Sequence, residues 1–371
     1  MWITNTAPVR HARRSCHRPA AFTLVELLTV VFIISLLIGI LIPSLSAART
    51  AAKKAVSAKT LKAIDVGLQM FKNDNESEYP QTNGYPPSFS HPPIAGYAFL
   101  PELGEFPFRS DKARVYGAMW LPAMLMGPDQ QGYIKRSTVP NKDGLRAAPE
   151  KWYTPDPLGD GKLLERAPYY LDPDASRTVR LKDLPGRENR HFFPSWSTDD
   201  NDPNAYQNMT VIVDAFDYPI LYYVANKNGR TTNMVAGEHD PEHNYEGGPQ
   251  QNGVPFYFHD DNDGFTGHSD NGTGQEGWNF NGPHPIAETG ADLDAAALVT
   301  DSLSADRGEK ITFAEYIVDR KIFRDLKSKP DPDAKTPLRP VNADSYLLIS
   351  PGPDGRYGTK DDVSNLPPFQ E

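Results

Sequence analysis

The feature that most constrains this chain is an apolar run near its start. Residues 22–42 read FTLVELLTVVFIISLLIGILI, 21 residues in which Glu26 is the single charge. As a helix this run rises about 31 Å, close to the roughly 30 Å hydrocarbon core of a bilayer. A secretory signal would have a shorter apolar region followed by a site of small residues, and residues 43–48 match such a site poorly. We therefore predict a membrane anchor.

The charges around this run predict its orientation. Four arginines and no acid lie in the first 21 residues, so the positive-inside rule places the N-terminus in the cytoplasm and the rest of the chain outside. Beyond them, 34 basic residues stand against 48 acidic ones, a balance of -14 that argues against nucleic acid as a partner. The single cysteine, Cys16, cannot support a disulfide framework.

Glu26 requires its own explanation, because a carboxylate inside a membrane helix is costly to insert. One interpretation is a snorkelling or protonated side chain near the membrane surface. The other is that the carboxylate pairs with a positive charge once copies of the chain assemble. The residues alone leave both interpretations open.

The residues around Glu26 also carry a resemblance. The hexapeptide AFTLVE at 21–26, between a basic leader and an apolar run that ends at Pro43, is similar to the cleavage and methylation signature of type IV prepilins and type II secretion pseudopilins. The resemblance implies that a membrane peptidase cuts between Ala21 and Phe22 and methylates the new amine of Phe22. It also implies assembly roles for Glu26 and Pro43. Glycine usually stands where this chain has Ala21, which predicts slower processing. The resemblance covers the first fifth of the chain.

The helix is predicted to continue past the membrane. Residues 44–73 are rich in Ala, Lys and Leu, which are strong helix formers. Apolar side chains recur there at 3-4-3 spacing, at Leu61, Ile64, Leu68 and Phe71. A helix over residues 22–73 would be about 78 Å long. We expect a cleaved leader (1–21), a membrane-spanning half (22–43), a soluble half (44–73) and a head (74–371) that buries the stripe.

The head is predicted to combine loops and strands. Residues 79–108 are rich in proline and aromatic residues, which predicts an ordered loop packed on a core. Four β-rich segments predict strands, at 209–213, 220–224, 254–258 and 345–349. The first two would form a hairpin through a turn at 217–219.

Two helices are predicted in the head. Residues 111–126 read as a helix with Ser110 as its N-cap and a break near Pro122. Residues 313–326 read as a second helix, because a capping box of Thr and Glu lies at 312–315.

Two segments of the head resemble the pseudopilin G branch of the same family. The segment DAFDYPILY at 214–222 is similar to its D-x-W/F-G-x-P-x-x-Y hairpin, with Asp217 in place of the usual glycine, and the loop at 350–363 is similar to its calcium loop. The family places these pieces close together, whereas about 120 residues separate them here. The resemblance implies an α+β, type IV pilin-like fold, a long helix packed on a small antiparallel sheet, with insertions at about 80–205 and 228–342.

The loop at 350–363 is the best candidate for chemistry. Calcium takes six to eight oxygens from carboxylates and carbonyls. By the resemblance, Asp354, Asp361 and Asp362 would supply side chains and Pro351 a backbone carbonyl. The alternative is a plain acidic turn stabilised by its own hydrogen bonds.

Other candidate sites are weaker. The acidic run HDDNDG at 259–264 lacks the first Asp and the final Glu of an EF-hand, so a solvated turn is favoured over another calcium loop. His239 and His243 have an i, i+4 spacing that could bind zinc, but Pro241 between them disfavours a helix and surface histidines are the better interpretation. No phosphate loop, nucleophile elbow or H-E-x-x-H motif argues for an enzyme.

These features predict a pseudopilin, a membrane-anchored subunit that assembles through its N-terminal helix into a periplasmic filament of a type II secretion system. The implied partners are the prepilin peptidase, other pseudopilins and further copies of itself, an assembly ATPase and an inner-membrane platform protein. The alternative is a minor type IV pilin or adhesin whose insertions bind a surface, a carbohydrate or a protein. A solitary anchored enzyme or sensor that shares only the leader is less favoured.

Overall fold

The chain divides into two compact units, Met1–Ala51 and Ala52–Glu371. The computed structural model describes residues 23–88, 115–135, 141–142, 145–146, 161–185, 206–227, 229, 256–267, 284–287, 313–318 and 340–366. The described part of the first unit is helical from Leu24 onward, and the second unit contains all of the described strands.

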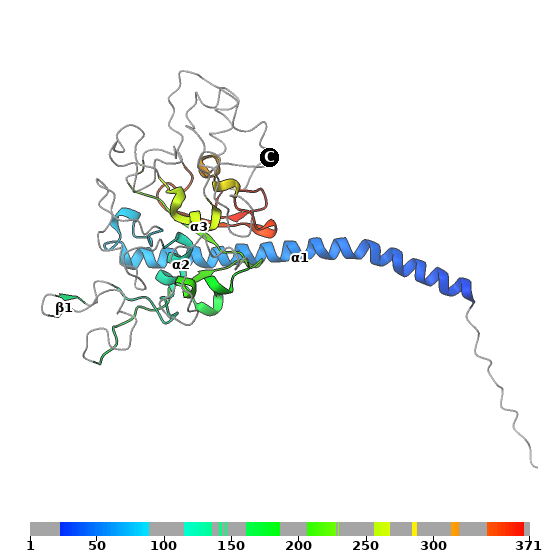
Figure 1. The fold of residues 1–371 in the computed structure, drawn as a ribbon, viewed down its shortest axis with the longest axis horizontal. Coiled ribbons are helices and arrows are strands. Elements are labelled where there is room, and N and C mark those ends of the chain that lie inside the picture. The colour runs from blue at the N-terminus through cyan, green and yellow to red at the C-terminus, as the bar shows by residue number, and fades with distance from the viewer. Residues whose placement is uncertain are drawn as a thin grey trace, which may run out of the picture. The chain divides into compact units, whose positions relative to one another are not determined.

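Helix α1 runs without interruption over Leu24–Asn75, 52 residues with Pro43 inside it (Figure 1). The helix predicted for residues 22–73 is confirmed, with each end shifted by two residues. Its buried positions in the head include all four members of the predicted stripe: Leu61, Ile64, Leu68 and Phe71. At its end the Asn75 amide donates to the Phe71 carbonyl (2.9 Å), which satisfies one acceptor of the last turn.

The described strands form three small antiparallel sheets. β1 (Asn141–Lys142) pairs with β2 (Leu145–Arg146). β3 (Thr178–Arg180) pairs with β4 (Thr210–Ile212). The third sheet has the order β5-β6-β7, formed by Leu221–Val224, Tyr346–Ser350 and Val363–Ser364. Every residue of β5 and β6 is buried. The predicted α+β class is confirmed, since a long apolar helix with small antiparallel sheets is consistent with the type IV pilin-like fold.

The strands predicted at 209–213 and 220–224 are present, but they belong to different sheets. β4 pairs with β3, whereas β5 pairs with β6 from Leu221 opposite Ile349 to Val224 opposite Tyr346. The bridge between Val213 and Pro219 closes the turn that joins them. Hydrogen bonds from the Asp214 N–H to the Tyr218 carbonyl and from the Ile220 N–H to the Ile212 carbonyl, both 2.9 Å, also pair the two segments. The expected hairpin is therefore present next to the turn, while β4 and β5 pair along their length with other strands. In Figure 1 the green β5 segment and the red C-terminal segment lie side by side, although they are far apart in sequence.

Helix α2 is shorter than predicted. It spans Gly117–Leu125 rather than 111–126, and its N-cap is Tyr116, not Ser110. Pro122 lies inside the helix instead of breaking it. All nine residues of α2 are buried. Burial on every side stabilises the helix enough to offset the hydrogen bond that proline removes.

Two further predictions fail between the middle of the chain and β6. Residues 256–258, expected to end a strand, lie in no strand. Helix α5 covers only Phe313–Ile317, because Val318 forms a bridge with Pro340. The N–H of Val341 also donates to the carbonyl of Ile317 (2.6 Å). Pairing with this distant segment ends α5 after Ile317, and residues 319–326 of the predicted helix lie outside the described residues.

The described parts of the segment between β5 and β6 are built into the core. Six of their large side chains are at most 7% exposed: Tyr257, Phe258, Phe265, Ile286, Phe313 and Tyr316. The Phe313 ring lies 5.0 Å from the ring of Tyr223 on β5. This segment therefore stabilises the sheet directly. The insertion limits at 80–205 and 228–342 remain predictions.

Candidate functional site

A capping box forms at the start of α1. The Thr23 hydroxyl accepts a hydrogen bond from the Glu26 N–H (3.2 Å). In return the Glu26 carboxylate accepts from the N–H (2.9 Å) and the hydroxyl (2.8 Å) of Thr23. This reciprocal arrangement satisfies donors that a helix start leaves unpaired and places a negative charge at the positive end of the helix dipole. Glu26 therefore has a partner within a single copy of the chain.

The first half of α1 is apolar and exposed. Its large hydrophobic side chains from Leu24 to Leu45 are 46–76% exposed. Among the described helices, α1 is the one with the length and apolar composition to cross a membrane. Such a surface is stable against lipid or against other apolar helices, and not in water.

Residues 16–42 match the family model of the prokaryotic N-terminal methylation motif. This motif supports a type IV pilin-like protein. It implies processing by the prepilin peptidase and pilus-like assembly in the membrane, and together with the apolar helix it fits a membrane-anchored pilin. Type IV pilin-like proteins are structural subunits, not enzymes. Ala21 and Phe22 are inside the match but outside the described residues. Neither curated proteins nor solved structures give a match to the chain.

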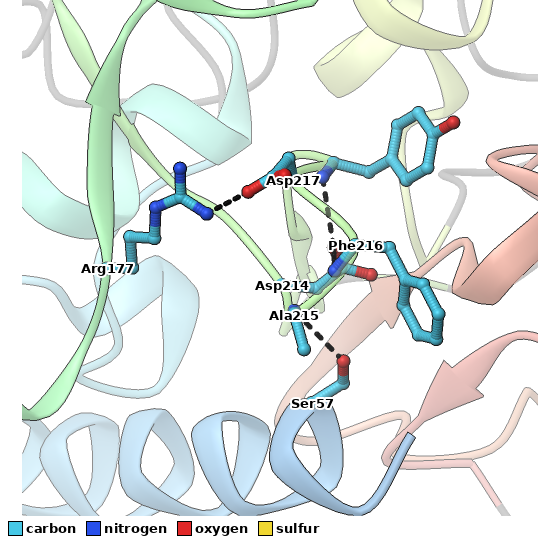
Figure 2. Close-up of polar contacts among 7 residues, drawn as sticks. Ser57, Arg177, Asp214, Ala215, Phe216 and Asp217 are labelled. Carbon is cyan, nitrogen blue, oxygen red and sulfur yellow. Dashed lines mark hydrogen bonds and ion pairs between the residues drawn. The ribbon is translucent and has the colours of Figure 1, made fainter. Parts of the chain in front are cut away.

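The turn at 214–219 is held against the head half of α1 (Figure 2). The N–H of Ala215 donates to the hydroxyl of Ser57, which is fully buried on the helix (3.2 Å). The Lys53 ammonium lies 5.2 Å from the centre of the Phe216 ring, within range of a cation–π interaction. The turn is therefore fixed to the same helix that carries the apolar anchor.

The Asp214 carboxylate organises this turn from within (Figure 2). One oxygen accepts from the N–H groups of Phe216 (2.8 Å) and Tyr218 (2.9 Å). The other accepts from the hydroxyl of Ser350 at the end of β6 (2.6 Å). Asp214 is 2% exposed, and burial raises the pKa of its carboxyl group although these donors oppose the shift. One side chain thus joins the turn to the C-terminal segment.

Asp217 adopts a backbone conformation that usually belongs to glycine. Its φ of 74° lies in the left-handed region, where aspartate is among the better tolerated residues. The resembling hairpin has glycine at this position, a residue that adopts this conformation readily. The carboxylate of Asp217 forms an ion pair with Arg177, which lies next to β3. Both side chains are largely exposed, so the pair adds little stability.

The loop at 350–363 lies against the same turn. The Tyr357 hydroxyl donates to the carbonyl of Pro219 (2.7 Å). Gly355, at a φ of 69°, lets the Tyr218 ring pack directly on its backbone, where any Cβ would overlap the ring. The loop at 350–363 and the turn at 214–219 are therefore in direct contact.

The three aspartates of the loop accept hydrogen bonds from the loop itself. Asp354 accepts from the N–H of Arg356 (2.8 Å). Asp361 and Asp362 both accept from the Thr359 hydroxyl, at 2.6 and 3.3 Å. Within the described ranges no three His, Cys, Asp or Glu side chains are gathered closely enough to hold a metal ion. The carboxylates therefore do not form a ready-made cage.

The electrostatics of the loop nevertheless suit a cation. Burial raises the pKa of Asp362 to about 8, against a hydrogen bond from the N–H of Gly358 (2.9 Å) that lowers it. Burial also raises the pKa of Asp354, and the neighbouring Asp361 adds to the shift. A divalent cation relieves such a cost because it stabilises ionised carboxylates. The donor chemistry thus fits calcium. The three aspartate side chains would have to rotate toward the ion, and Pro351, which is buried at the start of the loop, would supply its backbone carbonyl.

The second half of the acidic run at 259–264 is largely buried, so its interpretation as a solvated turn is wrong there. The run folds as a 3-10 turn (His259–Asn262) followed by α3 (Asp263–Thr266). Asp261 and Asn262 are 2% and 0% exposed. The Asn262 amide accepts from a backbone N–H of α2 (3.0 Å) and donates to a carbonyl of β5 (2.8 Å). The amide of Asn262 therefore bonds to the protein backbone.

Sequence reasoning missed three residues that bind the turn at 214–219 from distant parts of the chain: Ser57, Arg177 and Ser350. Their partners lie 158, 40 and 136 positions away, so no local pattern identifies them. Thr23 is different, because the Thr-x-x-Glu spacing of a capping box was visible in the sequence. The histidines His239 and His243 lie outside the described residues.

Proposed function

We propose that this chain is a pseudopilin of a type II secretion system, which polymerises through α1 into a periplasmic filament. The observation that carries the proposal is the methylation motif at residues 16–42 combined with an exposed apolar helix half. Such a helix requires lipid before assembly and neighbouring helices after it. The chain supplies shape and contacts. Processing comes from the prepilin peptidase, and force from an assembly ATPase acting through an inner-membrane platform protein.

We favour a secretion pseudopilin over a pilus subunit because of the head. The turn at 214–219 and the loop at 350–363, each similar to a segment of the pseudopilin G branch, lie against each other. Asp214 and Ser350 join them by a buried hydrogen bond. A contact that survives a separation of more than 120 residues indicates a common head architecture.

Glu26 has two roles in this proposal. In a single copy it caps α1 through Thr23. After cleavage the new amine of Phe22 is a cation, and in the filament this amine meets the Glu26 carboxylate of the same or a neighbouring copy. Removal of either partner would leave a charge stranded in an apolar environment, which strongly disfavours the packed state.

Two variants separate these roles. Glu26→Ala removes both the cap and the charge, whereas Glu26→Gln keeps an acceptor for the Thr23 donors and removes only the charge. We expect both variants to enter the membrane and neither to form filaments. The measurement compares membrane content with sheared filaments for wild type and both variants. Normal filaments from Glu26→Gln would refute the charge pairing. If Glu26→Ala alone then failed to form filaments, only the cap would matter.

We also propose that the loop at 350–363 binds calcium through Asp354, Asp361, Asp362 and the carbonyl of Pro351. The raised pKa values of two of these aspartates and the oxygen-rich donor set support the site. Binding would exchange the Thr359 hydroxyl for the ion at two carboxylates. Because the loop packs on the turn at 214–219, calcium would stabilise the contact between them.

A further inference from the structure

Helix α1 carries a second stripe on the side opposite to its core-facing stripe. Five exposed residues follow each other at three- and four-residue spacing: Val56, Lys59, Lys62, Val66 and Met70. Val56 and Val66 are each 53% exposed and Met70 is 48% exposed. At about 100° per residue this spacing places them on one face, away from the buried Leu61 and Leu68. We call these five residues the outer face of α1.

The lysines of the outer face belong to a cationic stretch without acids. Residues 44–64 contain five basic side chains and no acidic one, at Arg49, Lys53, Lys54, Lys59 and Lys62. None of the five forms an ion pair in the described part of the chain. Residues 65–371 contain 29 basic against 47 acidic residues, a balance of -18. This stretch of the helix and the rest of the chain thus carry opposite net charges, and within the described residues the lysines of the outer face form no ion pair.

We propose that the outer face of α1 docks on the acidic head of a second copy of this chain. The inference rests on the proposed function, because polymerisation brings the head of one copy beside the helix of the next. Lys59 and Lys62 supply the charge complementarity, which steers and orients such contacts. Val56, Val66 and Met70 supply the apolar area that exposed lysines alone would lack.

A lipid surface explains this face less well than a protein partner does. Lys59 and Lys62 follow Leu45 by 14 and 17 residues, a helical rise of roughly 21 and 26 Å beyond the apolar half. Charges interact with a membrane surface over a Debye length of about 8 Å. Arg49, with a rise of roughly 6 Å, lies within that range, and Lys54, at roughly 14 Å, lies closer to the lipid headgroups than Lys59 and Lys62 do.

Cross-linking of sheared filaments of the full-length, processed protein tests the contact directly. A zero-length carbodiimide joins an amine to a carboxylate only where the two touch. We expect a dimer band on a denaturing gel in which Lys59 or Lys62 is linked to an acidic residue of the head. Lys59→Arg with Lys62→Arg keeps the charge but removes the reactive amines, so filaments should form normally and this cross-link should disappear.

Charge reversal provides the second test. Lys59→Glu with Lys62→Glu should lower filament yield about tenfold or more, because attraction becomes repulsion. The matched control, Arg49→Glu with Lys54→Glu, should leave filament yield unchanged. Normal filaments from the Lys59/Lys62 reversal would overturn the inference and leave the proposed function intact. A wild-type dimer band in which neither Lys59 nor Lys62 is linked to the head would do the same. Loss confined to the Arg49/Lys54 reversal would also overturn it and indicate lipid. A wild type that forms no filaments would overturn both.

Discussion

Replacement of Asp214 provides the sharpest test of how the head is joined together. Asp214→Ala removes the acceptor of three donors, the N–H groups of Phe216 and Tyr218 and the hydroxyl of Ser350. Ser350 is fully buried, so its hydroxyl cannot turn to water instead. An unsatisfied buried donor costs about 1–3 kcal/mol, and the two backbone donors are only partly buried, so we expect a loss of about 3–5 kcal/mol. This is a large share of the roughly 5–15 kcal/mol that stabilises a domain.

Asp214→Asn is the matched control. Its amide oxygen can still accept both backbone N–H groups, so we expect a loss of only about 1 kcal/mol. Urea denaturation of the full chain in detergent, followed by tryptophan fluorescence to which the buried Trp120 contributes, measures both. If Asp214→Ala is as stable as Asp214→Asn, the carboxylate does not join the two segments and the reasoning is wrong.

The same pair of proteins predicts a pH dependence. Burial raises the pKa of Asp214 in the folded protein above the value of about 3.9 in the unfolded chain. As pH rises through this window, the unfolded chain has released a proton that the folded protein retains. The free energy of unfolding of the wild type therefore falls relative to that of Asp214→Asn as pH rises above about 4. A constant difference between the two proteins across this range would contradict the raised pKa.

Two further predictions concern the loop and the helix. Calcium at a hundredfold excess over Kd should stabilise the full chain by about 2.7 kcal/mol. Asp361→Ala with Asp362→Ala should abolish the resulting shift in melting temperature. If neither calcium nor a chelator changes the melting temperature of the wild type, the loop is a plain turn. Gly67→Ala should destabilise the head by about 1–3 kcal/mol despite the better helix propensity of alanine, because the new Cβ would lie 2.7 Å from the carbonyl oxygen of Tyr170. A urea midpoint that stays the same or rises would show that the segment carrying Tyr170 moves aside to make room for the methyl group.

Local patterns were sufficient to predict α1. Its apolar run is continuous in sequence, and the residues of its stripe from Leu61 to Phe71 follow each other within four positions. The position of β6 followed for the same reason, since a β-rich segment at 345–349 is visible by composition.

The errors arise where a distant partner decides the local conformation. β4 and β5 form the predicted hairpin only next to its turn, because β5 pairs along its length with β6 more than 120 residues later. Helix α5 has the residues to continue past Ile317, but pairing of Val318 with Pro340 ends it. Asn262 reads as part of a solvated acidic turn, and its burial between α2 and β5 is a property of the assembled core. No window of sequence contains these partners.

The central claim, that this chain is processed and assembled as a pilin-like subunit, depends on the residues around Ala21. Mass spectrometry of the protein isolated from its native membrane measures the new N-terminus directly. We predict that residues 1–21 are absent, that Cys16 is lost with them, and that the chain begins with N-methylated Phe22. An intact leader, or cleavage after Ala47 or Ala48 as by a secretory signal peptidase, would contradict the claim.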